Sequence, residues 1–245
     1  MRDNEYNRSY DDLKVHDDAF QPAEVRSVSA ANAFLNRVYG WMCLALALTG
    51  GTAWLVASQE NLLKAAIKGW WLLIILELGL VIGLTAAIRK ISPVTALIGF
   101  LAYSVVNGAT LSFVLIAYTQ ESVAGAFFAA SLTFGVTGLI GWFIKSDLSV
   151  LHRLLMMSLI GLIIASVINL FLGSSGLQFL ICVIGVLLFA ALTAYDTQKI
   201  KKLAMVMEEE DASFAGKVAV IGALALYLDF INLFLYLLQL FGRRR

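Results

Sequence analysis

Charged residues, prolines and cysteines are all scarce in this sequence. Of its 245 residues, 14% are charged, whereas a soluble globular domain carries roughly 25%. The two cysteines, Cys43 and Cys182, lie far apart inside apolar runs and have no second ligand at a useful spacing. This argues against a disulfide framework and against a cysteine-based metal site. A formal net charge of +1 offers no strongly basic surface to a nucleic-acid partner.

Catalytic motifs are absent from the sequence as well. It contains no H-E-x-x-H, no G-x-S-x-G and no Walker loop. An intramembrane aspartyl protease would need two aspartates on adjacent helices, and Asp196 and Asp229 superficially fit. However, Thr197 and Gln198 follow Asp196 where such proteases carry a glycine-rich motif. We therefore predict a protein that is not an enzyme and that holds no cofactor.

What the sequence has in abundance is long apolar runs, since 60% of its residues are hydrophobic. A helix needs ~20 residues to cross the ~30 Å hydrocarbon core of a bilayer, and each run is long enough. Because the backbone must satisfy its own hydrogen bonds in lipid, the runs predict helices. We expect an all-α membrane protein, a bundle of seven transmembrane helices embedded in the lipid bilayer. The runs are Val38–Ala57, Trp70–Ile88, Val94–Ala117, Val123–Ile144, Leu154–Leu172, Leu177–Tyr195 and Val218–Leu240.

The first 36 residues differ from the rest, because they are polar and acidic and have no apolar stretch of the kind found in a signal peptide. We interpret residues 1–36 as a disordered tail and residues 37–242 as the transmembrane domain.

Basic residues near the ends of the runs favour one orientation. One side carries ten of them: Arg26, Arg37, Arg89, Lys90, Lys145, Arg153, Lys199, Lys201, Lys202 and Lys217. The other side carries five: Lys64, Lys68, Arg243, Arg244 and Arg245. This predicts a cytoplasmic N-terminus and, with seven spans, a C-terminus outside. The cluster of three arginines argues against the second prediction and leaves it open.

Three acids lie within the runs, where an ionisable group is costly and therefore a candidate functional group. They are Glu77 in the second run, Asp196 at the end of the sixth and Asp229 in the seventh. Asn232 shares a helical face with Asp229. Glu77 has a plain alternative as a protonated acid that is hydrogen-bonded to a neighbouring helix.

Two more polar residues have both a functional and a plain structural interpretation. Arg89 ends the second run, and by itself it fits a side chain that reaches the headgroups beside Lys90. Asn107 shares a helical face with Ser104 and Thr110 in the third run. It fits an interhelical hydrogen bond better than an ion ligand, but its stripe should face the bundle interior. Asn107 and Asn232 are therefore the candidates for lining a pore.

Two segments carry a family resemblance. They are Ala-Tyr-Asp-Thr-Gln at residues 194–198 and Gly-Ala-Leu-Ala-Leu-Tyr-Leu-Asp-Phe-Ile-Asn-Leu-Phe at residues 222–234. Together they strongly resemble the Bax inhibitor-1 family, also called the transmembrane Bax inhibitor motif family, and look closest to its bacterial members. The resemblance extends over residues 30–242.

The resemblance implies six helices around a central seventh, with a path that opens by motion near the second span. It implies a pH-sensitive calcium leak channel, in which Asp196 and Asp229 form the pH sensor and bind the metal. Arg89 would engage Asp196, and Glu77 matches an acid of the second span. Calcium ions and protons would be the partners, and the bacterial inner membrane the location. A non-conducting regulator that binds other membrane proteins, such as a quality-control protease, is the alternative.

The proposed chemistry of the pair follows from simple electrostatics. Two carboxylates that share one site cannot easily both ionise, and their protons leave in coupled steps. Calcium prefers carboxylate oxygens, so it competes with those protons. On the run boundaries above, however, Asp196 lies near the cytoplasmic surface and Asp229 ~18 Å deep. The two can meet only if the sixth helix continues past Lys199 or the seventh begins before Val218.

Overall fold

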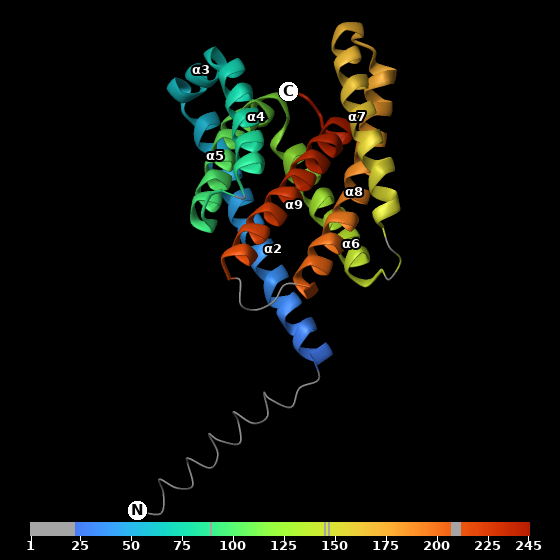
Figure 1. The fold of residues 1–245 in the computed structure, drawn as a ribbon. Coiled ribbons are helices and arrows are strands. Elements are labelled where there is room, and N and C mark those ends of the chain that lie inside the picture. The colour runs from blue at the N-terminus through green and yellow to red at the C-terminus, as the bar shows by residue number, and fades with distance from the viewer. Residues whose placement is uncertain (1–22, 89, 145, 147, 207–211) are drawn as a thin grey trace, which may run out of the picture.

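The regular structure of the described residues is helical throughout. The computed structural model describes residues 23–88, 90–144, 146, 148–206 and 212–245. Eight helices lie in these ranges (Figure 1). They are α2 (Ala23–Ser58), α3 (Glu60–Lys68), α4 (Trp70–Ala87), α5 (Pro93–Ala117), α6 (Gln120–Phe143), α7 (Ser149–Leu172), α8 (Ser175–Val206) and α9 (Ala212–Phe241).

Seven of these helices, all except α3, are long and apolar enough to cross a membrane. They correspond to the seven predicted runs and confirm the predicted all-α membrane fold. Consecutive spans run in opposite directions, so the N-terminal and C-terminal ends of the bundle lie on opposite sides (Figure 1).

Local signals in the sequence mark two of the helix ends. Ser92 caps the N-terminus of α5, because its hydroxyl accepts a hydrogen bond of 3.1 Å from the backbone N–H of Thr95. Pro93 then occupies the first helical turn, where a missing N–H costs nothing. At the end of α7, Gly173 adopts φ +60°, a left-handed conformation that glycine accepts without strain.

The short helix α3 is a difference from the sequence analysis, which treated the segment between the first two runs as a connection. Glu60 in its first turn forms an ion pair with Lys64, one turn later. Lys68 in the last turn also complements the helix dipole. None of its residues is buried, and Ile67 is exposed beside these charged side chains. These features are typical of a helix that lies in the membrane interface.

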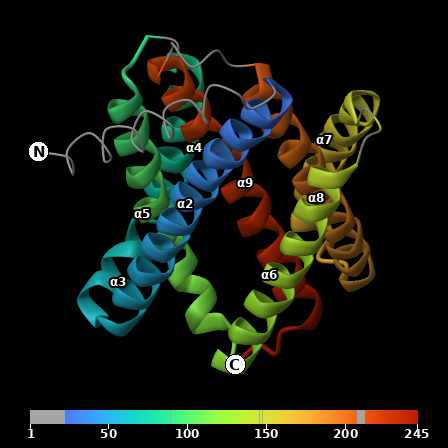
Figure 2. The same ribbon diagram turned by 90° about the horizontal axis from the view of Figure 1, so that it is seen from below.

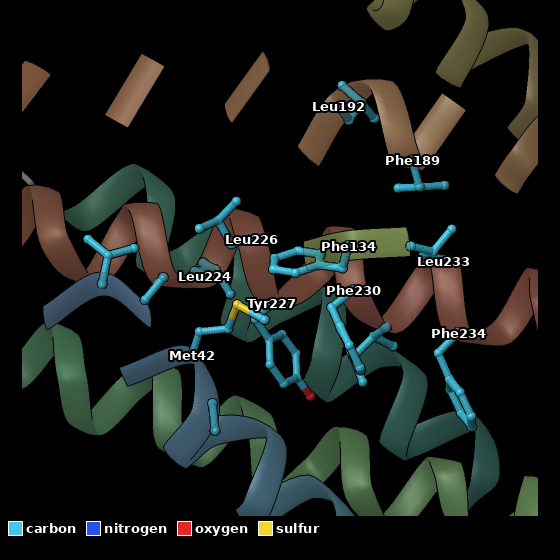
Figure 3. Packing of buried hydrophobic residues seen from close by; sticks show 14 of the residues in the cluster. Met42, Phe134, Phe189, Leu192, Leu224, Leu226, Tyr227, Phe230, Leu233 and Phe234 are labelled. Atoms are coloured by element: carbon cyan, nitrogen blue, oxygen red, sulfur yellow. The ribbon is translucent and has the colours of Figure 1, made fainter. Parts of the chain in front are cut away.

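Helix α9 is the centre of the bundle, as predicted. It packs against α2, α5, α6 and α8 and has the largest buried share of the seven spans. Figure 2 shows α9 between α2 and α6, and Figure 3 shows side chains of α2, α6 and α8 directed at it. Helix α4 lies outside, mainly against α5, and α7 lies mainly against α8. The central helix therefore has four close neighbours, and α4 and α7 form the flanks.

The start of α2 corrects the predicted boundary of the N-terminal tail at residue 36. The helix begins at Ala23, and Ala31, Leu35 and Val38 are buried in the core. Their spacing of four and three residues forms one apolar stripe on a helix. The predicted boundary lies too late in the sequence, because polar residues between the members of this stripe lower the apolar content of the segment. Residues 1–22, the rest of the predicted tail, lie outside the described residues.

Close helix contact depends on the glycines of α6. A methyl group at Gly141 would collide with the backbone carbonyl of Ala194 on α8. At Gly138 it would lie 3.2 Å from the Tyr39 hydroxyl. By contrast, a methyl group at Gly79 or Gly83 of α4 would meet nothing within 4 Å. The glycines of α4 therefore make no comparably close helix contact among the described residues.

Replacing Gly141 with alanine should destabilise the protein by about 1–3 kcal/mol, because α6 and α8 must move apart to admit the methyl group. Gly135→Ala in the same helix is the matched control, since a methyl group there meets nothing within 4 Å. Thermal unfolding in detergent, followed by circular dichroism, measures both variants. Equal melting temperatures for the two would contradict the close contact.

Candidate functional site

The length of α8 allows Asp196 and Asp229 to come together despite the difference in depth expected from the sequence. It continues as a helix to Val206, and α9 begins at Ala212, so both conditions stated for a meeting of the two aspartates are met. The carboxyl group of Asp229 lies close enough to that of Asp196 for their charges to influence one another. Two acids separated by 33 positions in the sequence are thus neighbours across the contact between α8 and α9.

Asp229 is the more deeply placed of the two. Only 5% of it is exposed, and within the described part of the chain its Oδ2 has no hydrogen-bond partner. A buried carboxylate without a partner costs several kcal/mol. This oxygen is therefore stable only if it carries a proton, meets a cation or receives water.

Asp196 lies where α8 meets the first turn of α7. Besides Asp229, its charged or titratable neighbours include Lys199 and His152. The ring of His152 stacks on that of Tyr195, with 4.6 Å between centroids and 14° between planes. The sequence assigns no role to His152, because no residue near it in the chain is a candidate partner for its ring. The α7–α8 contact brings it to the aspartate pair.

The two residues after Asp196 hold the site to its surroundings. The hydroxyl of Thr197 lies 3.3 Å from that of Tyr39 on α2. The buried amide of Gln198 donates to the carbonyls of Ile144 and Ser146 and accepts from the backbone N–H of Leu148, at 3.3, 2.8 and 3.1 Å. The Tyr-Asp-Thr-Gln string thus ties α8 to α2, α7 and the α6–α7 connection.

A second polar cluster surrounds Tyr227 on another face of α9. Its hydroxyl lies 2.7 Å from that of Thr49 and donates to Oδ1 of Asn107 at 3.0 Å. Thr49 also donates to the backbone carbonyl of Ser104 at 2.9 Å. The rings of Phe100 and Tyr103 meet the Tyr227 ring edge-on. These contacts join α2, α5 and α9 through one buried phenol.

Glu77 belongs to this second cluster. Its carboxyl group lies beside the side chains of Asn107 and Thr110, and its buried Oε1 has no hydrogen-bond partner in the described part of the chain. The predicted hydrogen bonding of Asn107 between helices is confirmed by its contact with Tyr227. The polar stripe of α5 does face the protein interior, because Ser104 and Asn107 are buried.

The structure therefore divides the predicted site residues into two groups. Tyr227 and Asp229 are two positions apart, or about 200° around the helix, so the clusters occupy opposite faces of α9. Asp196 and Asp229 meet on one face, and Glu77 and Asn107 on the other. Asn232 donates to the carbonyl of Leu228 within α9, at 2.8 Å. Arg89 lies outside the described residues, so its predicted pairing with Asp196 stays a prediction.

Comparison with known proteins identifies the family. A family profile described as "Inhibitor of apoptosis-promoting Bax1" matches residues 31–245. The chain belongs to the Bax inhibitor-1 family. It is 41% identical to inner membrane protein YbhL of Escherichia coli K12, over 90% of this chain and 96% of that protein. It is 39% identical to an uncharacterized protein of Borreliella burgdorferi, over 91% and 97% of the two chains.

Membership in the Bax inhibitor-1 family confirms the resemblance drawn from residues 194–198 and 222–234. A protein of Deinococcus radiodurans is 39% identical over 89% of this chain and 94% of its own. The matches thus cover nearly the whole length of these relatives. With seven apolar helices in the described residues, the chain is an integral membrane protein.

Removing the Tyr227 hydroxyl should lower stability by about 1–3 kcal/mol, because Tyr227→Phe leaves the buried amide of Asn107 and the hydroxyl of Thr49 without a shared partner. Thr49→Ser is the control, since it keeps a hydroxyl at the other end of the contact. Unfolding in detergent should show a clearly larger loss for Tyr227→Phe. A loss no greater than that of the serine variant would show that the hydroxyl contributes little.

Proposed function

We propose that this protein is a pH-sensitive leak channel or transporter for cations, with calcium as the transported ion and Asp196 and Asp229 as the pH sensor. The proposal rests on the closeness of these two acids and on the buried Oδ2 of Asp229, which has no hydrogen-bond partner in the described part of the chain. Such a pair changes its charge with pH, and its protons and a divalent cation compete for the same oxygens.

The two carboxylates supply few ligands for calcium, which suits an ion that passes through better than an ion that stays bound. Calcium takes 6–8 oxygen ligands in a tight site. The described residues contain no cluster of three or more histidine, cysteine, aspartate or glutamate side chains that could hold a metal. Two carboxylates would leave most of the coordination sphere to water and backbone. An ion held in this way dissociates readily, as conduction requires.

The flank helix α4 is the part of the bundle best placed to move. Leu84 is the single buried residue among those described in α4, and the main neighbour of this helix is α5. Its one acid, Glu77, faces the Tyr227 cluster. Displacing α4 would therefore expose that cluster at a small packing cost. Arg89, which follows α4, is proposed to bind Asp196 once both aspartates are ionised.

The remaining parts of the proposal concern location and class. We place the protein in a bacterial inner membrane with its N-terminus in the cytoplasm, on the basis of the basic residues near the ends of the runs and of the location named for YbhL. We propose no enzymatic activity and no cofactor. The regulator of other membrane proteins stays the alternative prediction. It would bind its partners through the N-terminal tail, residues 1–36, of which residues 1–22 lie outside the described residues.

Calcium flux into proteoliposomes across acid to alkaline pH tests the proposal. In the native protein, the half-saturating calcium concentration should rise as the pH falls, by up to about tenfold per pH unit where calcium displaces one proton. Asp229→Asn and Asp196→Asn should each remove this dependence, because one carboxylate of the pair is lost.

The control is Glu121→Gln, which removes an exposed carboxylate in the first turn of α6 and should keep the native pH response. An unchanged flux and pH response in both aspartate variants would rule out the proposed sensor. Absence of flux in the native protein would instead favour the regulator.

A further inference from the structure

An amphipathic pocket opens between helices of the bundle, and neither aspartate of the pair lines it. Its volume is about 590 Å³, and residues of α2, α5, α6 and α9 line it. The lining is mostly apolar and includes Trp54, Phe128 and Phe230. Trp54 is 68% exposed and Phe128 72% exposed, so the pocket faces the surroundings of the bundle, which in a membrane are lipid. Its volume lies in the usual range for small-ligand sites, roughly 300–1,000 Å³.

One end of the pocket is cationic, and the backbone fixes it there. After α9, the chain turns back along the α5–α6 connection. The backbone N–H of Arg245 donates to the carbonyl of Ala117 at 2.9 Å, and that of Thr119 donates to the carbonyl of Arg243 at 3.1 Å. The N–H of Arg243 also donates to the hydroxyl of Ser122, at 2.9 Å. These three bonds hold Arg245 in the pocket wall.

The charge at this end remains positive overall. Arg243, Arg244 and Arg245 lie together, and Glu121 is the acidic side chain that interacts with Arg245. The guanidinium of Arg244 stacks over the ring of Tyr118, 5.8 Å from its centroid. Arg245 is the one charged residue among the described residues that line the pocket, so its guanidinium group is the one available to an anion there. The wall beside Arg245 is also polar, with Gln120 and Ser58.

The dimensions of the pocket match one leaflet of a bilayer. Along α2 its lining runs from Leu46 to Ser58, about 18 Å of helix. Half of a ~30 Å hydrocarbon core is about 15 Å. Figure 1 shows that the α3–α4 corner lies at the same end of the bundle as the C-terminus. Trp70 and Trp71, the first residues of α4, are exposed, as is typical of the headgroup level of a membrane. Arg245 therefore lies at headgroup level and the apolar wall at the level of the acyl chains.

We propose that this pocket binds one phospholipid with an anionic headgroup, with an acyl chain between α2 and α6 and its phosphate at Arg245. The cation at one end and the apolar wall along the rest complement such a molecule at both ends. The lipid would couple the C-terminal segment to Phe230 on α9, the helix that carries Asp229.

Native mass spectrometry of the full chain in detergent, titrated with phosphatidylglycerol or phosphatidylcholine, tests the proposal. We expect one phosphatidylglycerol to be retained per chain at about fivefold lower lipid concentration than phosphatidylcholine. A preference of this size is what one cation near an anionic headgroup provides. Arg245→Gln should abolish this preference, and Gly50→Leu should remove the bound lipid. A leucine at Gly50 would project into the pocket, where its first methyl position meets no atom within 4 Å.

Two variants serve as matched controls. Arg243→Gln removes the same charge from a residue that does not line the pocket, and Gly51→Leu adds the same bulk one position along α2, where there is also open space. Both should retain phosphatidylglycerol as the native protein does. Equal retention of the two lipids, or equal loss in test and control variants, would overturn the proposal. So would a second copy of the chain held in place of lipid.

Discussion

The exclusion of water from the hydrocarbon core is the constraint on which the rest of this structure depends. A polar group in that layer can be satisfied only by protein, so the spanning segments must be helices and their polar side chains must turn inward. Helix α9 receives them, because four other spans pack around it. Burial and polar pairing are thus concentrated on the same helix, and a substitution on α9 affects both.

The two faces of α9 differ in how well their polar groups are satisfied. The Tyr227 hydroxyl has partners on both sides, and a satisfied buried network holds its helices in one arrangement. Asp229 instead keeps an oxygen without a partner among the described residues. A buried carboxyl group without a partner favours different neighbours when it is charged and when it is protonated. We infer that the hydroxyl face anchors α9 to α2 and α5, while the carboxyl face responds to protons and ions.

Much of this arrangement could be predicted from the sequence, and the parts that could not share a cause. The spans follow from apolar length alone, and the aspartate pair from a string specific to the family. Helix α3 and the first turns of α2 were missed because their apolar residues are interleaved with polar ones. Tyr227 was missed because it stands in an apolar run and looks like core. His152 has a partner only across the α7–α8 contact, which no local pattern reveals.

The arginines at residues 243–245 count as basic residues in the orientation rule, but in the structure they contact other parts of the protein. In the sequence they oppose the predicted orientation, since basic residues favour the cytoplasmic side. In the structure their backbone pairs with the α5–α6 connection, and Tyr118 and Glu121 contact their side chains. Charges held by the protein are weaker signals of topology than free ones. Basic residues of the other side are held as well, because Lys201 donates to the carbonyl of Trp142 at 2.8 Å and lies over its ring, and Lys199 lies over the ring of Tyr195. Contacts of this kind occur at both ends of the bundle, so they do not change the balance of basic residues, and the orientation stays a prediction.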